Sequence, residues 1–420
     1  MFNDFISLFQ TELYLKTWHY IYATWPAWLP IILIWLYVNT WLTYKRREWL
    51  YKKGSILLEI RIPQNTEKSP AAMEMVIEGI WEDVTDTLTG VYLDGALRDV
   101  FSLEIVSLGG EVKFFIWAFP KWKHVIESRI YAHYPGAEVV EVEDYALKVL
   151  FDPKTMSLSG VTTRLDKPDV FPIKTYIEFE LNKTAGKEQE EIVDPLAPIL
   201  EYLGTLKPGE QMWIQTVIQG HRREGFQDAR IFARPDYRED VKKEISKMLE
   251  KISFVEPEKD KVSGKPKARS LLDLTKSQGE VIAAIERNSA KLAFDTMMRM
   301  VYVAPKEIAV SRVVGFIGGM RQFGAKNLNG IRPHKFIPGI NYPWEDFLDI
   351  RKKYNQRTLL EAYKRRSVFN VPFRHALGKP YVLSTEELAT IFHFPGATVT
   401  TPTLSRVPSK KAEAPSNLPI

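Results

Sequence analysis

The clearest feature of the hydrophobic pattern is an uncharged stretch near the N-terminus. No Lys, Arg, Asp or Glu stands between Lys16 and Lys45, and the second half of this stretch is almost continuously apolar. A helix of roughly 18 such residues is about 27 Å long, close to the thickness of the hydrocarbon core of a bilayer. The pattern predicts a transmembrane helix over residues 25–44, with Pro26 and Pro30 in its first turns. Its predicted membrane-anchoring aromatic residues are Trp25, Trp28, Trp35 and Trp41.

The flanking residues distinguish this span from a buried core helix or a cleaved signal peptide. A signal peptide begins with positive charge and ends at small residues, whereas Asp4 and Glu12 precede this run and a basic cluster follows it. Positive charge stays on the cytoplasmic side of a membrane, so the cluster predicts an outside N-terminus and a cytoplasmic C-terminal bulk. These topology residues are Lys45, Arg46 and Arg47. Residues 1–24 are predicted to lie along the outer interface as an amphipathic segment.

Residues 45–150 carry six successive patterns in the order β-α-β-β-α-β, which predicts a first ferredoxin-like module. Strands alternate apolar and polar positions, helices place apolar residues on one face, and Gly109-Gly110 marks a hairpin turn. The six elements are a strand at 55–62, a helix at 71–81, strands at 101–107 and 111–118, a helix at 121–134 and a strand at 137–142.

Residues 170–335 repeat part of this order and predict a second α/β module of the ferredoxin-like type. The repeat is one of element order only, and a Lys-, Pro- and Gly-containing stretch near 255–270 is predicted to be a mobile insertion. The elements are a strand at 174–180, a helix at 194–204, a strand at 211–218, helices at 235–252 and 277–291, a strand at 294–303 and a helix at 306–323.

The C-terminal part of the chain has a different character. Residues 340–395 form a basic helical segment that ends in a short helix, for which Ser384 is the predicted N-cap. Residues 396–420 are rich in Pro, Ser and Thr and are predicted to be an extended tail that does not fold by itself. The predicted fold class is therefore α+β, with a transmembrane helix, two tandem ferredoxin-like modules, a basic helical segment and a tail.

Composition narrows the chemistry. The chain contains no Cys, which excludes disulfides and Cys-based metal sites or catalysis, and which fits a reducing compartment. The net charge of +5 arises from well-mixed acidic and basic residues, so it says little about partners. The residues after the predicted span suffice for two or three domains.

The motifs of nucleotide hydrolysis and metal binding are absent from the sequence. A P-loop requires Gly-Lys followed by Ser or Thr, and none of the three Gly-Lys pairs, which begin at Gly186, Gly264 and Gly378, fits that rule. The seven His residues are scattered and none has another four residues away. We therefore expect no enzyme activity, no cofactor and no metal. The carboxylate pairs at 190–191 and 386–387 are expected to be solvated helix faces.

The strongest candidate site is the basic run of residues 351–379, in which aromatic residues such as Tyr354 and Tyr363 are interleaved. Basic groups neutralise phosphates and aromatic rings stack on bases, so contact with DNA is one interpretation. Attraction to anionic lipid headgroups or to protein is a second, and a solvated helix face without a special role is a third. The candidate contact residues are Arg351, Lys352, Lys353, Arg357, Lys364, Arg365, Arg366 and Arg374.

Several stretches resemble one family. Residues 101–117, 125–138 and 142–145 resemble the membrane-proximal N-terminal region of bacterial conjugation or type IV secretion-like ATPases of the HerA/FtsK class, and residues 383–395 and 406–419 resemble the segment that leads into their ATPase core. The similarity spans most of residues 30–420. It implies the anchoring half of a DNA-translocating machine, with the P-loop motor on a separate polypeptide.

The resulting hypothesis is a non-enzymatic, single-pass accessory subunit in the inner membrane of a bacterium. Its cytoplasmic modules are expected to form a homo-oligomeric collar, and its expected partners are the membrane, a separate HerA/FtsK-type ATPase and DNA. The tail is expected to dock the motor through Arg406, Lys410, Lys411 and Leu418. The alternative is a membrane-tethered scaffold that binds lipid headgroups or protein and has no role with DNA.

Overall fold

The chain divides into two compact units, which we call the helical unit and the sheet unit. The helical unit comprises Met1–Lys52 and Thr85–Leu97, and the sheet unit comprises Lys53–Val84 and Arg98–Ile420. The computed structural model describes residues 2–63, 68–82, 86–182, 194–228, 234, 236–253, 275–306, 312–339, 342–370, 372–374, 376–396 and 406–407.

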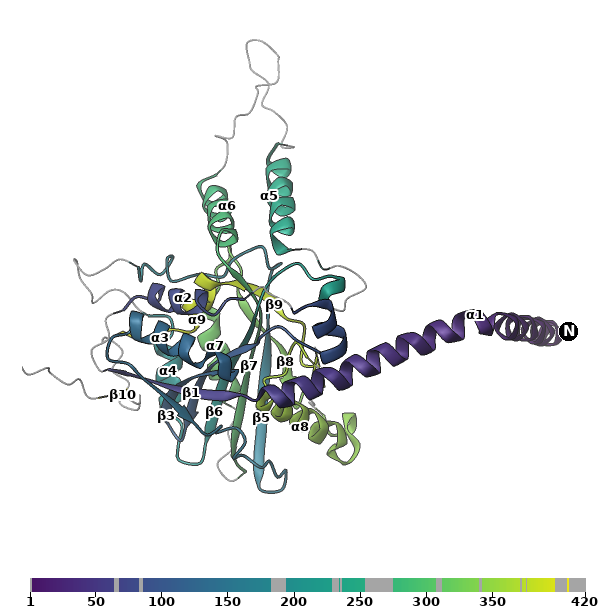
Figure 1. Cartoon of the computed structure of the whole chain (residues 1–420), viewed down its shortest axis with the longest axis horizontal. Coiled ribbons are helices and arrows are strands. Elements are labelled where there is room, and N and C mark those ends of the chain that lie inside the picture. Colours follow the sequence, from purple (N-terminus) through teal and green to yellow (C-terminus); the bar gives the residue numbers. More distant parts are fainter. Residues whose placement is uncertain are drawn as a thin grey trace, which may run out of the picture. The chain divides into compact units, whose positions relative to one another are not determined.

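The helical unit is built on one long helix, α1 (Phe2–Lys53), shown in purple in Figure 1. Its side chains from Tyr14 to Thr40 are almost all exposed. Among the described residues, α1 alone is long and apolar enough to cross a membrane, a criterion of length and composition that a signal sequence also meets. Two polar side chains within it, Thr24 and Asn39, donate to backbone carbonyl oxygens four residues earlier, at 2.6 and 2.7 Å. Such internal satisfaction of polar groups suits a helix surrounded by apolar material.

Two details of α1 differ from the sequence-based expectation. The helix runs without a break through residue 24, so the segment predicted to be a separate interfacial piece is continuous with the predicted span. Pro26 and Pro30 lie inside the helix and not in its first turns. Each interior proline removes one backbone hydrogen bond, a loss that long apolar helices tolerate more readily than soluble ones.

A short segment completes the helical unit. It contains the π-helical turn η1 (Gly90–Asp94), and the indole Nε1 of Trp41 donates to the Tyr92 carbonyl oxygen at 3.0 Å. Gly95, with φ +76°, lies so close to α1 that a Cβ there would stand 2.4 Å from the carbonyl carbon of Lys45. Only glycine permits both that conformation and that approach.

The described strands of the sheet unit form one ten-stranded sheet. Its strand order is β10-β1-β3-β2-β6-β7-β5-β8, with β4 beside β1 and β9 beside β7. The strands are β1 (Ile56–Pro63), β2 (Phe101–Leu108), β3 (Glu111–Ala118), β4 (Glu138–Val142), β5 (Met156–Leu165), β6 (Gln211–Gly220), β7 (Ala293–Pro305), β8 (Ile331–Ile337), β9 (Tyr381–Ser384) and β10 (Arg406–Val407).

Alternation along the strands feeds two hydrophobic clusters on opposite faces of the sheet. On β1, Ile56, Leu58 and Ile60 belong to the larger cluster, whereas Leu57 belongs to the smaller one. The period of two sends successive side chains to opposite faces. The larger cluster is covered by α2 (Ala71–Glu78), α3 (Lys123–His133), α4 (Ala197–Gly204), α7 (Val313–Met320) and α9 (Thr385–Ile391), and the smaller by α8 (Ile350–Lys364). The helices α5 (Tyr237–Ser253) and α6 (Lys276–Ser289) pack against each other through a third cluster.

The six elements predicted between residues 55 and 142 are present in the predicted order. Their strands pair antiparallel in the order β4-β1-β3-β2. The prediction of two tandem ferredoxin-like modules is nevertheless not confirmed, because the strands of both predicted modules belong to a single sheet whose overall order is not ferredoxin-like. The junction is the antiparallel pair β2–β6, which runs from Phe101↔Ile218 to Leu108↔Gln211.

The second predicted module holds the clearest errors. Residues 174–180, predicted as a strand, form no strand, and residues 176–180 are turns. The backbone N–H groups of Ile173 and Tyr176 donate to the side chains of Glu387 and Thr390 on α9 and not to another strand. Conversely β5, β8 and β9 were not predicted. In β5 the small Gly160 lies against β7, where a Cβ would stand 2.4 Å from the Met300 carbonyl oxygen. The predicted insertion near 255–270 lies outside the described residues.

Candidate functional site

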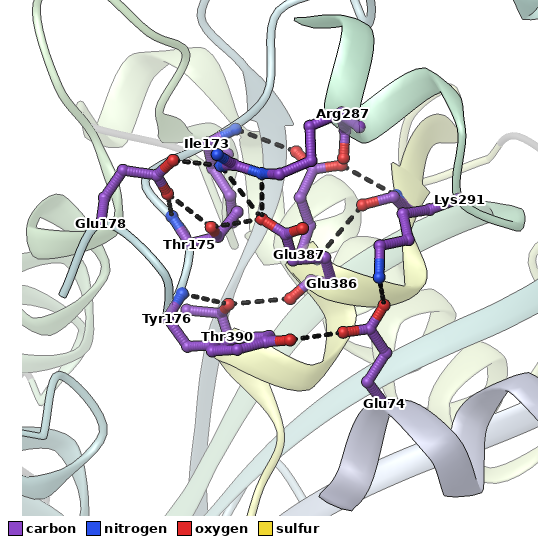
Figure 2. A network of polar contacts seen from close by, with 12 residues as sticks. Glu74, Ile173, Thr175, Tyr176, Glu178, Arg287, Lys291, Glu386, Glu387 and Thr390 are labelled. Atoms are coloured by element: carbon purple, nitrogen blue, oxygen red, sulfur yellow. Dashed lines mark hydrogen bonds and ion pairs between the residues drawn. The ribbon is translucent and has the colours of Figure 1, made fainter. Parts of the chain in front are cut away.

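The most extensive polar arrangement surrounds helix α9, and we call it the α9 network (Figure 2). It joins α9 to α2, to α6 and to the turn segment 173–178. The helix begins with a capping box in which Ser384 accepts from the Glu387 N–H and Glu387 accepts from the Ser384 N–H. The network consists of Glu74, Ile173, Thr175, Tyr176, Glu178, Arg287, Asn288, Lys291, Ser384, Thr385, Glu386, Glu387 and Thr390.

Glu386 and Glu387 are buried, so the expectation that this pair forms a solvated helix face is wrong. Glu386 accepts from the Thr175 hydroxyl at 2.6 Å and pairs with Arg287 at 3.2 Å. Glu387 accepts from the N–H of Ile173 at 2.9 Å and from the Asn288 amide at 3.1 Å. Burial raises the pKa of Glu387 to about 7, and the backbone hydrogen bonds from Ser384 and Ile173 oppose that rise.

The remaining contacts of the α9 network centre on Glu74 of α2. Glu74 on α2 accepts from the Tyr176 hydroxyl at 2.6 Å and from the Thr385 hydroxyl at 3.1 Å, and Lys291 pairs with it at 2.8 Å. Figure 2 shows these side chains converging on α9 from three directions. The carboxylates are thus engaged by donors from distant parts of the same chain. This arrangement links α9 to segments that are distant from it in the sequence.

A second buried arrangement contains Arg366, one of the predicted contact residues. Its guanidinium forms two parallel hydrogen bonds to the Glu104 carboxylate, at 3.0 and 3.1 Å, and also pairs with Asp144. Burial alone would lower the pKa of Arg366, but the two carboxylates raise it above its ordinary value. The Glu104 carboxylate also accepts from Tyr145 at 2.8 Å and Gln215 at 2.7 Å. Because its side chain is fully buried, Arg366 cannot contact nucleic acid or headgroups.

A second buried arginine lies beside it. Arg299 on β7 donates to Gln215 at 2.6 Å and to the carbonyl oxygens of Ala362 and Ser367 at 2.7 and 3.2 Å. These carbonyl groups lie at and just beyond the C-terminus of α8, the negative end of the helix dipole. Burial lowers the pKa of Arg299 to about 9. The sequence analysis missed this residue, since an arginine amid the apolar run of β7 gave no sign of its distant partners.

The other predicted contact residues occupy different positions. Lys364 is half-buried and donates to the Val149 carbonyl oxygen at 2.7 Å, which gives it a structural role. Arg365 is exposed and lies 3.5 Å from Glu361. Arg374 is exposed as well. The structure brings together only the N-terminal members of the predicted set, Arg351, Lys352, Lys353 and Arg357, on the first two turns of α8.

These four cations share a surface with apolar side chains that the site prediction omitted. Trp344 and Phe347 are 80% and 82% exposed, and Leu348, Ile350 and Tyr354 each exceed 60%. Tyr342 and Trp344 stack on each other at 4.7 Å between ring centroids. We call this region the aromatic–basic surface. It comprises Tyr342, Trp344, Phe347, Leu348, Ile350 and Tyr354 with Arg351, Lys352, Lys353 and Arg357. The apolar cluster directly before the basic run was the available signal.

A capping interaction shapes this surface. The Asp346 carboxylate accepts from the N–H groups of Arg351 and Lys352 at 2.9 and 2.7 Å and so caps α8 from four residues before its start. Although burial alone would raise the pKa of Asp346, these backbone hydrogen bonds lower it. Between cap and helix, Leu348 and Asp349 adopt left-handed conformations with φ of 59° and 57°. Such backbone strain in residues with side chains persists only where the surroundings impose it.

Each of the buried histidines His221 and His393 lies beside an aspartate. His393 directs Nε2 to Asp194 at 3.1 Å and Nδ1 to the Ala389 carbonyl oxygen at 3.0 Å. Burial alone would lower the pKa of His393, but the charge of Asp194 and the hydrogen bond to it outweigh burial and raise the pKa above its ordinary value. His221 lies 3.0 Å from Asp295 through Nδ1, and its Nε2 accepts from the Tyr237 N–H at 3.2 Å. No group of three potential ligands that could hold a metal ion occurs among the described residues.

The residues predicted to mark the membrane and the motor-docking tail are placed as follows. Trp25, Trp28 and Trp35 are exposed on α1, and Trp41 binds Tyr92 as described above. Lys45 pairs with Glu48 at 3.0 Å, Arg46 is half-buried and Arg47 is exposed. Arg406 lies in β10, which pairs in parallel with β1 through Ile62↔Arg406. The other docking residues, Lys410, Lys411 and Leu418, lie outside the described residues.

Comparison with known proteins gives one family. No curated protein matches the chain. A family described as a domain of unknown function, DUF8128, matches residues 35–407, which include the last part of the apolar run in α1 and nearly all of the sheet unit. The chain therefore belongs to the DUF8128 family.

Proposed function

We propose that this protein is a non-enzymatic, single-pass membrane accessory subunit. Residues 25–44 would cross the inner membrane of a bacterium, with the N-terminus outside and the sheet unit in the cytoplasm. The observation that carries the proposal is α1, whose apolar side chains are exposed over more than a bilayer's thickness. The buried carboxylates, arginines and histidines described above are engaged in structural pairs, which supports a role in positioning other components and not in catalysis.

The machine that we propose it serves is a DNA-translocation assembly of the conjugation or type IV secretion kind, with a separate HerA/FtsK-type ATPase as partner. Residues 101–117, 125–138 and 142–145 resemble the membrane-proximal part of such motors, and residues 383–395 and 406–419 resemble the segment that leads into their ATPase core. This resemblance supports the assignment. The exposed cations Arg351, Lys353 and Arg357 can neutralise phosphate groups, whether those of DNA or those of lipid headgroups. The apolar members of the aromatic–basic surface favour the alternative, a scaffold that binds lipid or protein and has no role with DNA.

Membrane extraction tests the anchor. Wild-type chain should resist alkaline carbonate, and the double substitution Leu33→Arg with Leu36→Arg should release it, since each arginine at the centre of a span costs about 2.5–3.5 kcal/mol. Tyr51→Arg, at a 90% exposed position beyond the predicted span, is the matched control and should stay in the membrane. A wild-type chain in the supernatant would refute the proposal, as would mass-spectrometric detection of a mature chain from which α1 had been cleaved.

The same membranes test the motor partner. Solubilised full-length chain should capture a P-loop ATPase, and deletion of residues 401–420 should abolish that capture if the tail docks the motor. Undiminished capture by the deletion variant would exclude the docking role of the tail.

A further inference from the structure

We propose that the aromatic–basic surface is a second membrane contact, through which the sheet unit binds peripherally to anionic lipid headgroups. This inference rests on the proposed function, because the span in α1 would tether the sheet unit to a membrane. It assigns a role to residues 342–357 that is separate from the crossing of the membrane by α1.

The apolar component of the surface has the composition of an interfacial anchor. Its side chains include Trp344, Tyr342 and Tyr354, whose rings are amphipathic and partition to the headgroup level of a bilayer. Phe347, Leu348 and Ile350 add purely apolar side chains at the tip of the loop, all of them more than 60% exposed. Clustered exposure of this kind marks an interaction site, whereas single exposed apolar residues are ordinary.

The charged component complements an anionic bilayer. Arg351, Lys353 and Arg357 are exposed and Lys352 is half-buried, all within the first two turns of α8. Basic groups beside inserted apolar side chains are attracted to the negative surface potential of the cytoplasmic leaflet. Acidic groups are present too: Glu345 and Asp349 are exposed, and Lys352 lies 3.9 Å from Asp349. Asp346 is a third acidic group; it is buried, and its carboxylate is held by the N–H groups of Arg351 and Lys352. Its negative charge weakens the attraction of the surface to anionic lipid.

The loop is held in shape. Asp346 binds two backbone N–H groups of α8, Lys353 donates to the Leu348 carbonyl oxygen at 3.2 Å, and Arg351 donates to that of Glu345 at 3.3 Å. These contacts impose the left-handed backbone of Leu348 and Asp349 and present the side chains of residues 347–350 to solvent. A preorganised loop loses little conformational entropy when it inserts.

Two other occupants fit less well. Single-stranded nucleic acid binds by stacking its bases on aromatic side chains. Here Tyr342 and Trp344 already stack on each other, and Leu348 and Ile350 have no aromatic ring on which a base could stack. A two-fold contact between copies would bring the cations of α8 from one copy close to those of the other, which like-charge repulsion disfavours. An anionic bilayer uses both the aliphatic and the basic side chains.

Site-directed spin labelling provides the test, because the chain contains no Cys. Full-length Phe347→Cys would be labelled and placed in nanodiscs of phosphatidylcholine alone or mixed with phosphatidylglycerol. Oxygen accessibility should rise several-fold, and accessibility to a water-soluble nickel chelate should fall, relative to detergent and most strongly with the anionic lipid. Val314→Cys is the matched control, because it is 72% exposed on α7, which covers the opposite face of the sheet, and it should not change.

The charge dependence gives a second readout. Combined replacement of Arg351, Lys352, Lys353 and Arg357 by Gln should abolish the difference between the two lipid mixtures. An unchanged label at position 347 in chains that co-elute with nanodiscs would overturn this inference and leave the anchor intact, whereas chains that never enter nanodiscs would overturn the proposed function itself. Immobilisation of the label only by duplex DNA, or dipolar broadening between two labelled copies, would also overturn it in favour of those occupants.

Discussion

At the scale of single residues, two neighbouring arginines show that the local sequence does not predict which of them is buried. Arg365 and Arg366 belong to one basic run and were assigned one role. In the structure Arg365 is exposed beside Glu361, whereas Arg366 is fully buried against Glu104 and Asp144. Arg366 also has a positive φ of 48°, which turns the chain sharply after α8. No local pattern separates the two residues, because the carboxylate that selects Arg366 lies 262 positions away.

This difference predicts unequal effects of the same substitution. Arg366→Ala should lower the free energy of unfolding by about 3–5 kcal/mol, because it leaves Glu104 buried without its counter-charge. Arg365→Ala should change it by less than about 0.5 kcal/mol, since exposed pairs contribute little. Urea titration of the full-length variants in mild detergent measures both values. Similar losses for the two substitutions would contradict the buried geometry.

At the scale of elements, helix α9 shows both the strength and the limit of local signals. Its start was predicted from Ser384 and the acidic residues that follow, and the capping box confirms it. The burial of every residue from Thr385 to Ile391 was not predicted, because the polar sequence resembles a surface helix. The same network explains the failed strand at 174–180, whose backbone donors serve the side chains of α9.

A second capping box provides the comparison that tests this view. Thr275 caps α6 at an exposed position, with the same reciprocal bonds to Gln278 that Ser384 makes to Glu387. Thr275→Ala should lower stability by about 0.5–1 kcal/mol, and Ser384→Ala by about 2 kcal/mol, because the buried N–H of Glu387 finds no water in exchange. Chemical unfolding of both variants measures the difference. Equal losses of stability would show that the burial of α9 does not increase the contribution of its capping residue.

At the scale of the whole molecule, the continuous sheet replaces the predicted pair of modules. The β2–β6 pairing joins the strands of one predicted module to those of the other, and the larger hydrophobic cluster contains residues of both. Phe114 on β3 and Phe294 on β7 are both buried in that cluster. A shared core couples the two parts energetically, as separate modules would not.

The sheet unit should therefore unfold in one transition. Far-UV circular dichroism and tryptophan fluorescence should give coincident urea curves, and Phe114→Ala and Phe294→Ala should each shift the entire curve, by about 3–5 kcal/mol. Two resolved transitions, with each substitution moving only one of them, would instead favour independent modules.

The sequence by itself determined the features that arise from short-range pattern. These include the apolar run of α1, the hairpin around Gly109-Gly110, the order of the six elements up to residue 142, and the start of α9. Tertiary structure alone decided which strands became neighbours, that Gly160 fits a central strand, and that Arg366, Glu386 and Glu387 are buried. The physical reason is that periodicity and capping depend on residues within one or two turns, whereas burying a charge depends on a partner brought close only by the completed fold.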